Sequence, residues 1–308
     1  MPRFAAVVAG SPPSRPTIAT GIWLYLGALF LLAAMYTLMK LIADRYPATQ
    51  IVFFRATIGF LPMIFLVKAG GGLASLRTKR PLGHVSRGII NLSVLISFAF
   101  ALSVLPLADT YAISFAAPLF VAALAIPFLG ERVDGRRWVA VIAGFVGVLI
   151  VVRPGSAGAD NLVFLGAIAA LVGALSYALS LVTARMLGQT ETPAAVGFYP
   201  AAIIAVGAFG LLPYGFVWPT AGDFIILVMI GVLGGMSTIL INAAFRVAPS
   251  AVLAPLDYSG MIWAVLFGFA IWGNVPDSVT FNGAAIIAAS GLYVLHREAA
   301  AKRRLVAA

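Results

Sequence analysis

The segment VLPLADTYAISFAAP (residues 104–118) has a counterpart 143 residues later, VAPSAVLAPLDYSGM (residues 247–261). The stretches that follow, 130–153 and 273–297, also correspond, and they end in GVLIVVR and GLYVLHR. Similarity at a fixed offset indicates an internal repeat. The alternative is that apolar helices resemble one another by composition, but here glycines, prolines and terminal arginines align as well.

The composition indicates a membrane protein. Of 308 residues, 62% are hydrophobic and 10% are charged, whereas soluble domains have about 25% charged residues. There is no cysteine, which excludes disulfides and thiol chemistry. The net charge of +10 would suggest a nucleic-acid partner in a soluble protein. The cations instead lie in short segments between apolar runs, so we expect a lipid bilayer as partner and no nucleic acid.

Ten apolar runs are long enough, at about 20 residues each, to cross a bilayer. They lie at 20–42, 48–68, 86–104, 108–129, 136–152, 162–186, 193–214, 222–245, 250–273 and 279–296. We therefore predict an all-α polytopic membrane protein with ten transmembrane helices. The repeat divides it into halves of five helices at 18–153 and 162–297, with tails at 1–17 and 298–308. Because five is odd, the halves must have inverted orientations, a pattern typical of transporters.

The positive charges predict the orientation. Of the 20 Lys and Arg residues, 16 lie in or beside segments on the side that holds both termini, and only Arg45 and Arg153 lie in the opposite loops. The positive-inside rule then places both termini in the cytoplasm.

Several stretches resemble a known family. These are FFR (53–55), the block SFAAPLFVAALAIPFLGERVDGRRWVAVIAGFVGVLIVVRP (114–154), and APLDYSGMIWAVLFGFAIWGNVPDS (254–278) with its continuation to Glu298. The chain resembles the ten-span EamA family of the drug/metabolite transporter superfamily. One departure is Gly273-Asn274, where members often repeat the Gly-Glu pair of Gly130-Glu131; we interpret Glu131 as structural.

The resemblance implies transport of a small organic metabolite across the bacterial inner membrane by alternating access, without a cofactor and without enzymatic chemistry. It implies a vitamin such as riboflavin, a nucleoside derivative such as S-adenosylmethionine, or an amino acid as substrate. Export of drugs or amino-acid-like metabolites is the alternative. Proton coupling and a homodimer both stay open.

Three ionisable residues lie within the predicted spans, where a charge is costly and usually faces the interior. Arg55 lies about five residues, roughly 8 Å, inside its helix, and either ties helices together or holds an anionic part of the substrate. Lys40, near a helix end, is an interfacial lysine or a second cation of the outer vestibule. Asp257, which follows Pro255, is a proton-coupling or substrate-amine site, or else a hydrogen-bonded residue at a helix break.

Neutral polar and aromatic residues complete the candidate binding set. They are Tyr36, Asn91, Ser114, Tyr177, Asn242 and Tyr258, with Tyr111 and Tyr199 as further candidates. Ser114 is the repeat equivalent of Asp257, and Tyr36 can be aligned with Tyr177. Aromatic walls with a few polar groups suit planar organic ligands. For each residue, helix packing is the alternative role.

Two other classes are disfavoured. An intramembrane enzyme or a metal site needs converging acids, nucleophiles or ligands, but His84 and His296 both lie at the predicted cytoplasmic interface and no HExxH motif occurs. A channel needs a charged ring or symmetry-related pore lining, and a scaffold has no distinctive signal here.

Overall fold

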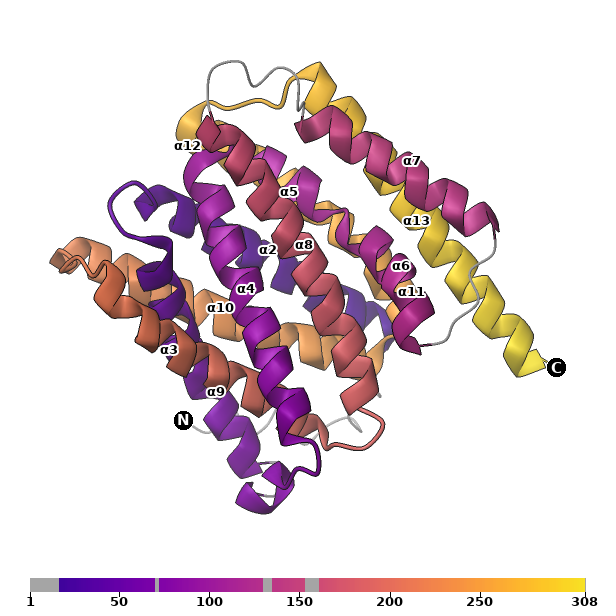
Figure 1. The fold of residues 1–308 in the computed structure, drawn as a ribbon, viewed down its shortest axis with the longest axis horizontal. Helices are drawn as coiled ribbons and strands as arrows, with labels where there is room; N and C mark the ends of the chain where they lie inside the picture. Colours follow the sequence, from indigo (N-terminus) through magenta and orange to yellow (C-terminus); the bar gives the residue numbers. More distant parts are fainter. Residues whose placement is uncertain (1–16, 70–71, 130–134, 153–160, 308) are drawn as a thin grey trace, which may run out of the picture.

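The computed structural model describes residues 17–69, 72–129, 135–152 and 161–307, and no strand occurs in these ranges (Figure 1). Residues 1–16 of the predicted tail and Glu131 lie outside the described residues. The helices are α2 (Ile18–Ile42), α3 (Ala48–Ala69), η1 (Gly72–Leu76), α4 (Pro81–Val104), α5 (Leu107–Ser114), α6 (Ala117–Leu129), α7 (Gly135–Val152), α8 (Asn161–Leu187), α9 (Pro193–Leu211), η2 (Leu212–Tyr214), α10 (Ala221–Val247), α11 (Ser250–Leu253), η3 (Ala254–Ser259), α12 (Gly260–Trp272) and α13 (Ser278–Ala307).

Seven segments in the described ranges are long and apolar enough to cross a membrane. They lie in α2, α4, α5 with α6, α8, α9, α10 and η3 with α12. Shorter apolar stretches occupy Ala48–Leu61, Trp138–Val152 and Ser278–Val294. The molecule is therefore an all-helical protein with several helices suited to a bilayer.

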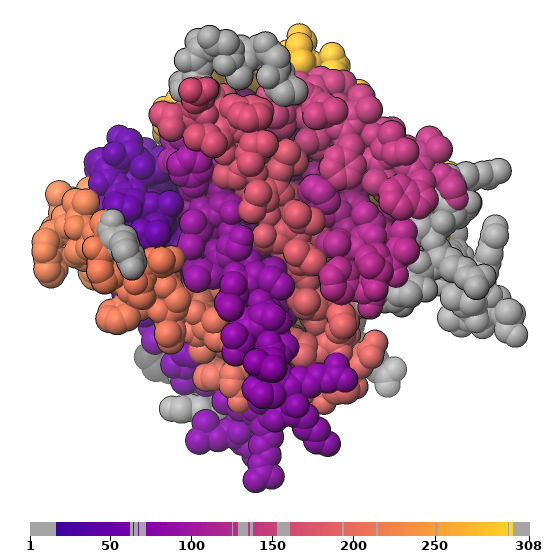
Figure 2. Space-filling view, in the orientation of Figure 1, coloured from indigo at the N-terminus to yellow at the C-terminus, as the bar shows by residue number. Residues whose placement is uncertain are grey.

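The helices pack as a single bundle. At one edge α3 lies against α9, and at the other α7 lies against α13 (Figure 1). Between these edges α2 packs along α10 and α4 packs along α8. The space-filling view shows α4 and α8 side by side on one face (Figure 2). The interior of the bundle is thus bordered by α2, α4, α8 and α10.

Close helix contacts occur in matched pairs. Gly88 of α4 packs against Ile203 of α9, and Gly231 of α10 packs against Ile58 of α3. In both pairs the isoleucine occupies the position where a Cβ on the glycine would lie. Gly231 follows Gly88 by 143 residues, and Ile203 follows Ile58 by 145. Small residues at such positions let helices approach closely.

A second matched pair joins the ends of the long helices. Gly21, early in α2, meets the side chain of Val247 at the end of α10, and Gly166, early in α8, meets that of Val104 at the end of α4. The corresponding residues are again 145 and 143 positions apart. The α2–α10 and α8–α4 contacts are thus built from the same residue types at the same offset.

Two spans that the sequence predicts as continuous helices are interrupted. The span 108–129 is divided into α5 and α6 at Phe115 and Ala116, and the span 250–273 is divided into α11, η3 and α12. Pro255 lies in η3, where its missing N–H and fixed φ favour a departure from α-helix. The Phe115 and Tyr258 rings meet edge to face with centroids 4.9 Å apart, so the two breaks touch.

Two boundaries also differ from the predicted ones. Helix α4 begins at Pro81, five residues before the predicted span, with proline in its first turn. Helix α13 continues through Ala307 and includes most of the predicted tail at 298–308.

Candidate functional site

Asp257 and Tyr25 form a short polar contact inside the bundle. The Tyr25 hydroxyl of α2 donates to Oδ1 of Asp257 over 2.6 Å. Tyr25 is buried, whereas Asp257 is exposed to solvent at the η3 break. Within the described ranges no cation pairs with Asp257. The carboxylate is thus oriented by one hydroxyl and keeps acceptor capacity for another group.

Tyr177 of α8 lies on the same side of the bundle interior as Asp257. Ile168, Val172 and Leu175 are exposed at helical spacing and mark the outward face of α8. At 100° per residue Tyr177 projects from the opposite face, yet 49% of it is exposed. It also interacts electrostatically with Asp257. We infer that Tyr177 and Asp257 face a shared, solvent-accessible part of the interior.

Tyr258 is placed by neighbours at the α5–α6 break and on α13. Its ring contacts Phe115, and its hydroxyl lies against Gly291 of α13, where a Cβ would collide with it. No described residue hydrogen-bonds this buried hydroxyl. Tyr258 also interacts electrostatically with Asp257, so it belongs to the same cluster.

An aromatic cluster lies nearer the other end of α2. Tyr36 contacts Phe98 of α4 and Tyr111 of α5, with ring centroids 4.8 Å and 5.8 Å apart. Ser114 donates to the backbone oxygen of Tyr111 over 2.7 Å. The buried Tyr111 hydroxyl has no hydrogen-bond partner among the described residues. The cluster therefore combines flat apolar faces with a donor that has no protein acceptor.

Arg55 of α3 lies beside this cluster. Its Nε donates to the Met35 sulfur over 3.2 Å, and it packs against Gly234 of α10. It also interacts electrostatically with Tyr36. The described residues give this guanidinium no carboxylate partner and no further hydrogen bond. Because a thioether is a weak acceptor, most of the guanidinium donors stay available.

The Lys40 ammonium is hydrogen-bonded to groups of the protein itself. Its ammonium donates to the carbonyl oxygens of Leu102 and Leu105 over 3.0 Å and 2.7 Å and lies 5.7 Å from the centre of the Trp272 ring. These carbonyls end α4, where a cation also complements the helix dipole. Lys40 therefore joins α2 to the end of α4 and to α12.

Three other candidates lie apart from these clusters. The Tyr199 hydroxyl donates to the backbone oxygen of Leu76, and its ring stacks beside His84. Asn242 is exposed on α10 and Asn91 is half-buried on α4, and neither side chain hydrogen-bonds to a described residue.

Sequence reasoning missed Tyr25 and Arg87. Tyr25 precedes Tyr36 by 11 residues, about three helical turns, so both lie on one face of α2, and this spacing could have identified it. Arg87, interpreted from the sequence as a cytoplasmic cation, lies in α4 and donates to the backbone oxygens of Ser180 in α8 and Val196 in α9. No local pattern in the sequence marks that role.

Each end of the bundle carries a polar tie between segments that are distant in the sequence. At the α2–α3 turn, Arg45 and Tyr46 both donate to Asp223 of α10, over 2.7 Å and 2.9 Å. Gln50 and the backbone of Val217 add two hydrogen bonds at the same end.

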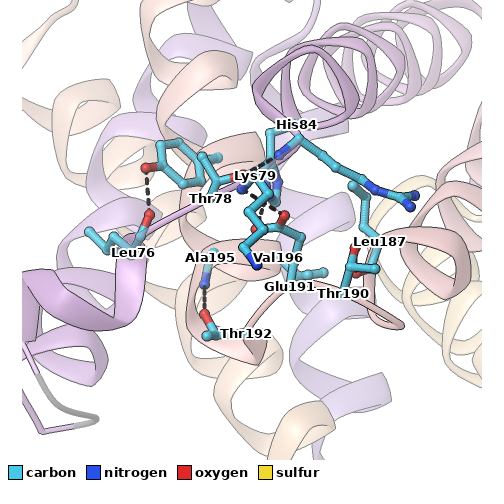
Figure 3. Close-up of polar contacts among 12 residues, drawn as sticks. Leu76, Thr78, Lys79, His84, Leu187, Thr190, Glu191, Thr192, Ala195 and Val196 are labelled. Atoms are coloured by element: carbon cyan, nitrogen blue, oxygen red, sulfur yellow. Dashed lines mark hydrogen bonds and ion pairs between the residues drawn. The ribbon is translucent and has the colours of Figure 1, made fainter.

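At the α8–α9 turn, Glu191 accepts from the backbone N–H of Lys79 over 3.0 Å and lies 3.4 Å from Nε2 of His84 (Figure 3). Burial opposes the ionisation of Glu191. The hydrogen bonds from Lys79, Thr78 and His84 outweigh that effect and hold the pKa of this carboxyl below its ordinary value. Both ends of the bundle are thus tied through a carboxylate.

Comparisons with known proteins agree with this architecture. Residues 19–153 match the EamA-like transporter family. The chain is 28% identical to an S-adenosylmethionine uptake transporter of Rickettsia bellii, over 92% of this chain and 95% of that protein. It is 29% identical to a pseudopaline exporter of Pseudomonas aeruginosa (88% and 94% covered) and 28% identical to a riboflavin transporter of Rhizobium johnstonii (95% of each).

A crystal structure that is 19% identical superposes with a TM-score of 0.62 and covers 91% of this chain and 98% of its own. That likeness concerns the fold alone. The family match and the three transporters indicate small-metabolite transport rather than enzymatic chemistry. Residues 19–153 thus match the EamA-like transporter family, and the relatives that are similar over nearly the whole chain are named as transporters of small metabolites.

Proposed function

We propose that this protein carries a positively charged or zwitterionic organic metabolite by alternating access, with the cationic group held at Asp257. The observation that carries this proposal is an accessible carboxylate inside the bundle whose hydrogen-bond partner is Tyr25. Tyr177 of α8 and Tyr258, the next residue in η3, lie within electrostatic reach of it. Aromatic faces around a carboxylate suit an organic cation, because both attract positive charge.

The topology we propose is ten membrane-spanning helices in two inverted halves, 18–153 and 162–297. Helix α3 has 22 residues, about 33 Å at 1.5 Å per residue, which is long enough to cross a bilayer. The matched glycine contacts at offsets of 143 and 145 residues support the repeat. So does the contact between Phe115 and Tyr258, which are 143 residues apart and would lie on the pseudo-twofold axis.

The location we propose is the bacterial inner membrane, with both termini in the cytoplasm. The distribution of Lys and Arg supports this orientation. Asp257 and Tyr25 would then lie in the cytoplasmic half, and Arg55, Lys40 and Tyr36 in the outer half.

The breaks at Ser114 and Asp257 support a site between the halves. Discontinuous helices at a repeat interface form the substrate sites of many transporters. Here the breaks meet through Phe115 and Tyr258. Arg55 would hold an anionic group of the substrate while Asp257 holds the cation. S-adenosylmethionine, which has a sulfonium, an amine, a carboxylate and a planar base, fits this arrangement and is named for one relative.

A second candidate substrate is a neutral planar vitamin. The Tyr36–Phe98–Tyr111 cluster favours it, because flat aromatic faces and the unpartnered Tyr111 hydroxyl suit a heteroaromatic ring. Riboflavin is the corresponding substrate named for another relative. Export is an alternative direction, as in the pseudopaline exporter.

The test is counterflow in proteoliposomes against a panel of cationic, zwitterionic, neutral and anionic metabolites. We expect a cationic or zwitterionic compound to exchange in the wild type, and Asp257→Asn to reduce that exchange at least tenfold. Asp44→Asn is the matched control, since it makes the same chemical change at an exposed outer carboxylate. Exchange of neutral compounds alone, or equal rates in Asp257→Asn and wild type, would exclude the proposed site.

Proton coupling at Asp257 is part of the proposal. An accessible carboxylate can bind a proton when the substrate cation leaves. Asp257→Asn should then abolish dependence on a pH gradient while leaving measurable substrate exchange. A pH-gradient dependence that is unchanged in this variant would refute the coupling role.

A further inference from the structure

A groove of about 400 Å³ lies between the start of α4 and the end of α8, away from the proposed substrate site. The residues that form it include Lys79, Arg80, Leu82, Ser86, Met186 and Leu187. Gly83, also in its lining, lets α4 approach Leu187, because a Cβ there would lie 2.8 Å from that side chain. We call this feature the α4–α8 groove.

The groove has two cations at its rim. The side chains of Lys79 and Arg80 are exposed, and within the described residues neither forms an ion pair. Their backbone is held in place, since Lys79 N–H donates to Glu191 over 3.0 Å (Figure 3). Arg80 N–H donates to the Thr78 hydroxyl, also over 3.0 Å. The Glu191 carboxylate is buried against His84, so the rim presents net positive charge.

The rest of the groove is apolar and continues onto the lipid-facing side of α4. Leu82, Val85 and Ile89 recur at helical spacing and are exposed by 82%, 43% and 59%. Ser86, in the groove, adjoins this stripe on α4. Its hydroxyl donates to the Gly83 oxygen, and the Thr183 hydroxyl to that of Leu179, so these donors are used internally. The groove therefore offers cations to a charged headgroup and apolar walls to a chain.

We propose that the α4–α8 groove binds an anionic phospholipid, with its phosphate between Lys79 and Arg80 and an acyl chain along Leu82, Val85 and Ile89. Charge complementarity identifies the headgroup, and the continuous apolar stripe favours a lipid over a free phosphate. On the proposed orientation the lipid belongs to the cytoplasmic leaflet, where anionic headgroups attract juxtamembrane cations. This site is separate from substrate binding and does not depend on which metabolite is carried.

The test is native mass spectrometry of the full-length protein in detergent with equal amounts of phosphatidylglycerol and phosphatidylcholine of the same chains. Wild type should retain phosphatidylglycerol preferentially. Lys79→Gln with Arg80→Gln should reduce that preference by roughly fivefold for each cation removed. Ser86→Phe, which fills the groove and leaves the charges unchanged, should reduce retention of both lipids.

The matched control is Arg77→Gln with Arg246→Gln, which removes two exposed cations on the same face outside the groove lining. It should retain the wild-type preference, whereas an equal loss in control and test variants would mean non-specific charge attraction and overturn the proposal. Competition by millimolar inorganic phosphate or glycerophosphoglycerol as effectively as by the lipid would assign a soluble-anion site instead. The wild-type measurement tests the proposal even if a variant fails to fold. Equal retention of the two lipids by wild type would contradict the proposal.

Discussion

The bundle interior holds a carboxylate near the start of α2 and two cations near its end. These charged groups differ in how many hydrogen-bond partners the protein itself gives them. Near the start of α2, Asp257 accepts a hydrogen bond from Tyr25 and stays exposed. Near the end of α2, Lys40 is bound by two backbone oxygens, while Arg55 has a sulfur atom as its hydrogen-bond acceptor. The comparison separates a structural cation, Lys40, from two charged groups, Asp257 and Arg55, that keep capacity for a ligand.

The largest effect after Asp257 is expected at Arg55. Arg55→Gln should reduce transport of a zwitterionic substrate about 10- to 100-fold, because a charge-assisted hydrogen bond contributes roughly 1.5–3 kcal/mol. Arg55→Lys should fold normally yet stay impaired, since an ammonium lacks the bidentate fork. Uptake by proteoliposomes at equal protein content is the measurement. If Arg55→Ala is well expressed and fully active, Arg55 does not bind substrate and has a structural role like that of Lys40.

Tyr25→Phe tests the role of the hydrogen bond between Tyr25 and Asp257. It removes one hydroxyl that orients Asp257 and leaves the ring contact with Phe245. We expect an approximately threefold to tenfold rise in the substrate concentration for half-maximal uptake, with little change in thermal stability. A large loss of stability with unchanged apparent affinity would show that the Tyr25–Asp257 bond serves packing.

Lys40→Met should mainly affect stability. The substitution leaves the Leu102 and Leu105 oxygens without their ammonium donor and should cost about 1–3 kcal/mol of unfolding free energy. Thermal unfolding in detergent measures this cost. If uptake fell tenfold or more while the melting temperature stayed at the wild-type value, Lys40 would belong with Arg55 as a ligand-binding cation.

The smallest effect concerns the ends of the bundle. The pKa of Glu191 in the folded protein lies below its ordinary value of 4.5, so its ionised, hydrogen-bonded form stabilises the fold above that pH. Glu191→Gln should lower the melting temperature at pH 7, and the difference from wild type should shrink as the pH falls through and below 4.5. A difference that stays constant between pH 7 and pH 4 would contradict this assignment.

The sequence predicts helix positions well where apolar residues are continuous, as at α2 and α3, whose observed bounds nearly equal the predicted 20–42 and 48–68. It misses the first turn of α4, because Gly83, His84 and Ser86 lower its hydropathy although Pro81 marks a helix start. It also misses the interruptions at Phe115 and in η3. Those depend on contacts between the two breaks that hydropathy does not record.

The candidate residues were identifiable because charges inside apolar runs are rare, but their partners were not. The Lys40 ammonium meets backbone oxygens 62 and 65 residues away, and Tyr25 meets Asp257 across 232 residues. Such pairings follow from how the helices cross, which spacing along one helix cannot specify. The Tyr25–Tyr36 spacing on α2 was the one local signal for the missing partner of Asp257.

Competition between two nearly identical ligands tests the proposed charge recognition at Asp257 most directly. S-adenosylmethionine has a sulfonium where S-adenosylhomocysteine has a neutral thioether, so their relative inhibition of uptake reports on recognition of that positive charge. Wild type should prefer S-adenosylmethionine at least tenfold, and Asp257→Asn should reduce the preference to near unity, while Asp44→Asn keeps it. A preference of the same size in wild type and Asp257→Asn, or no preference in wild type, would contradict recognition of a cation at Asp257.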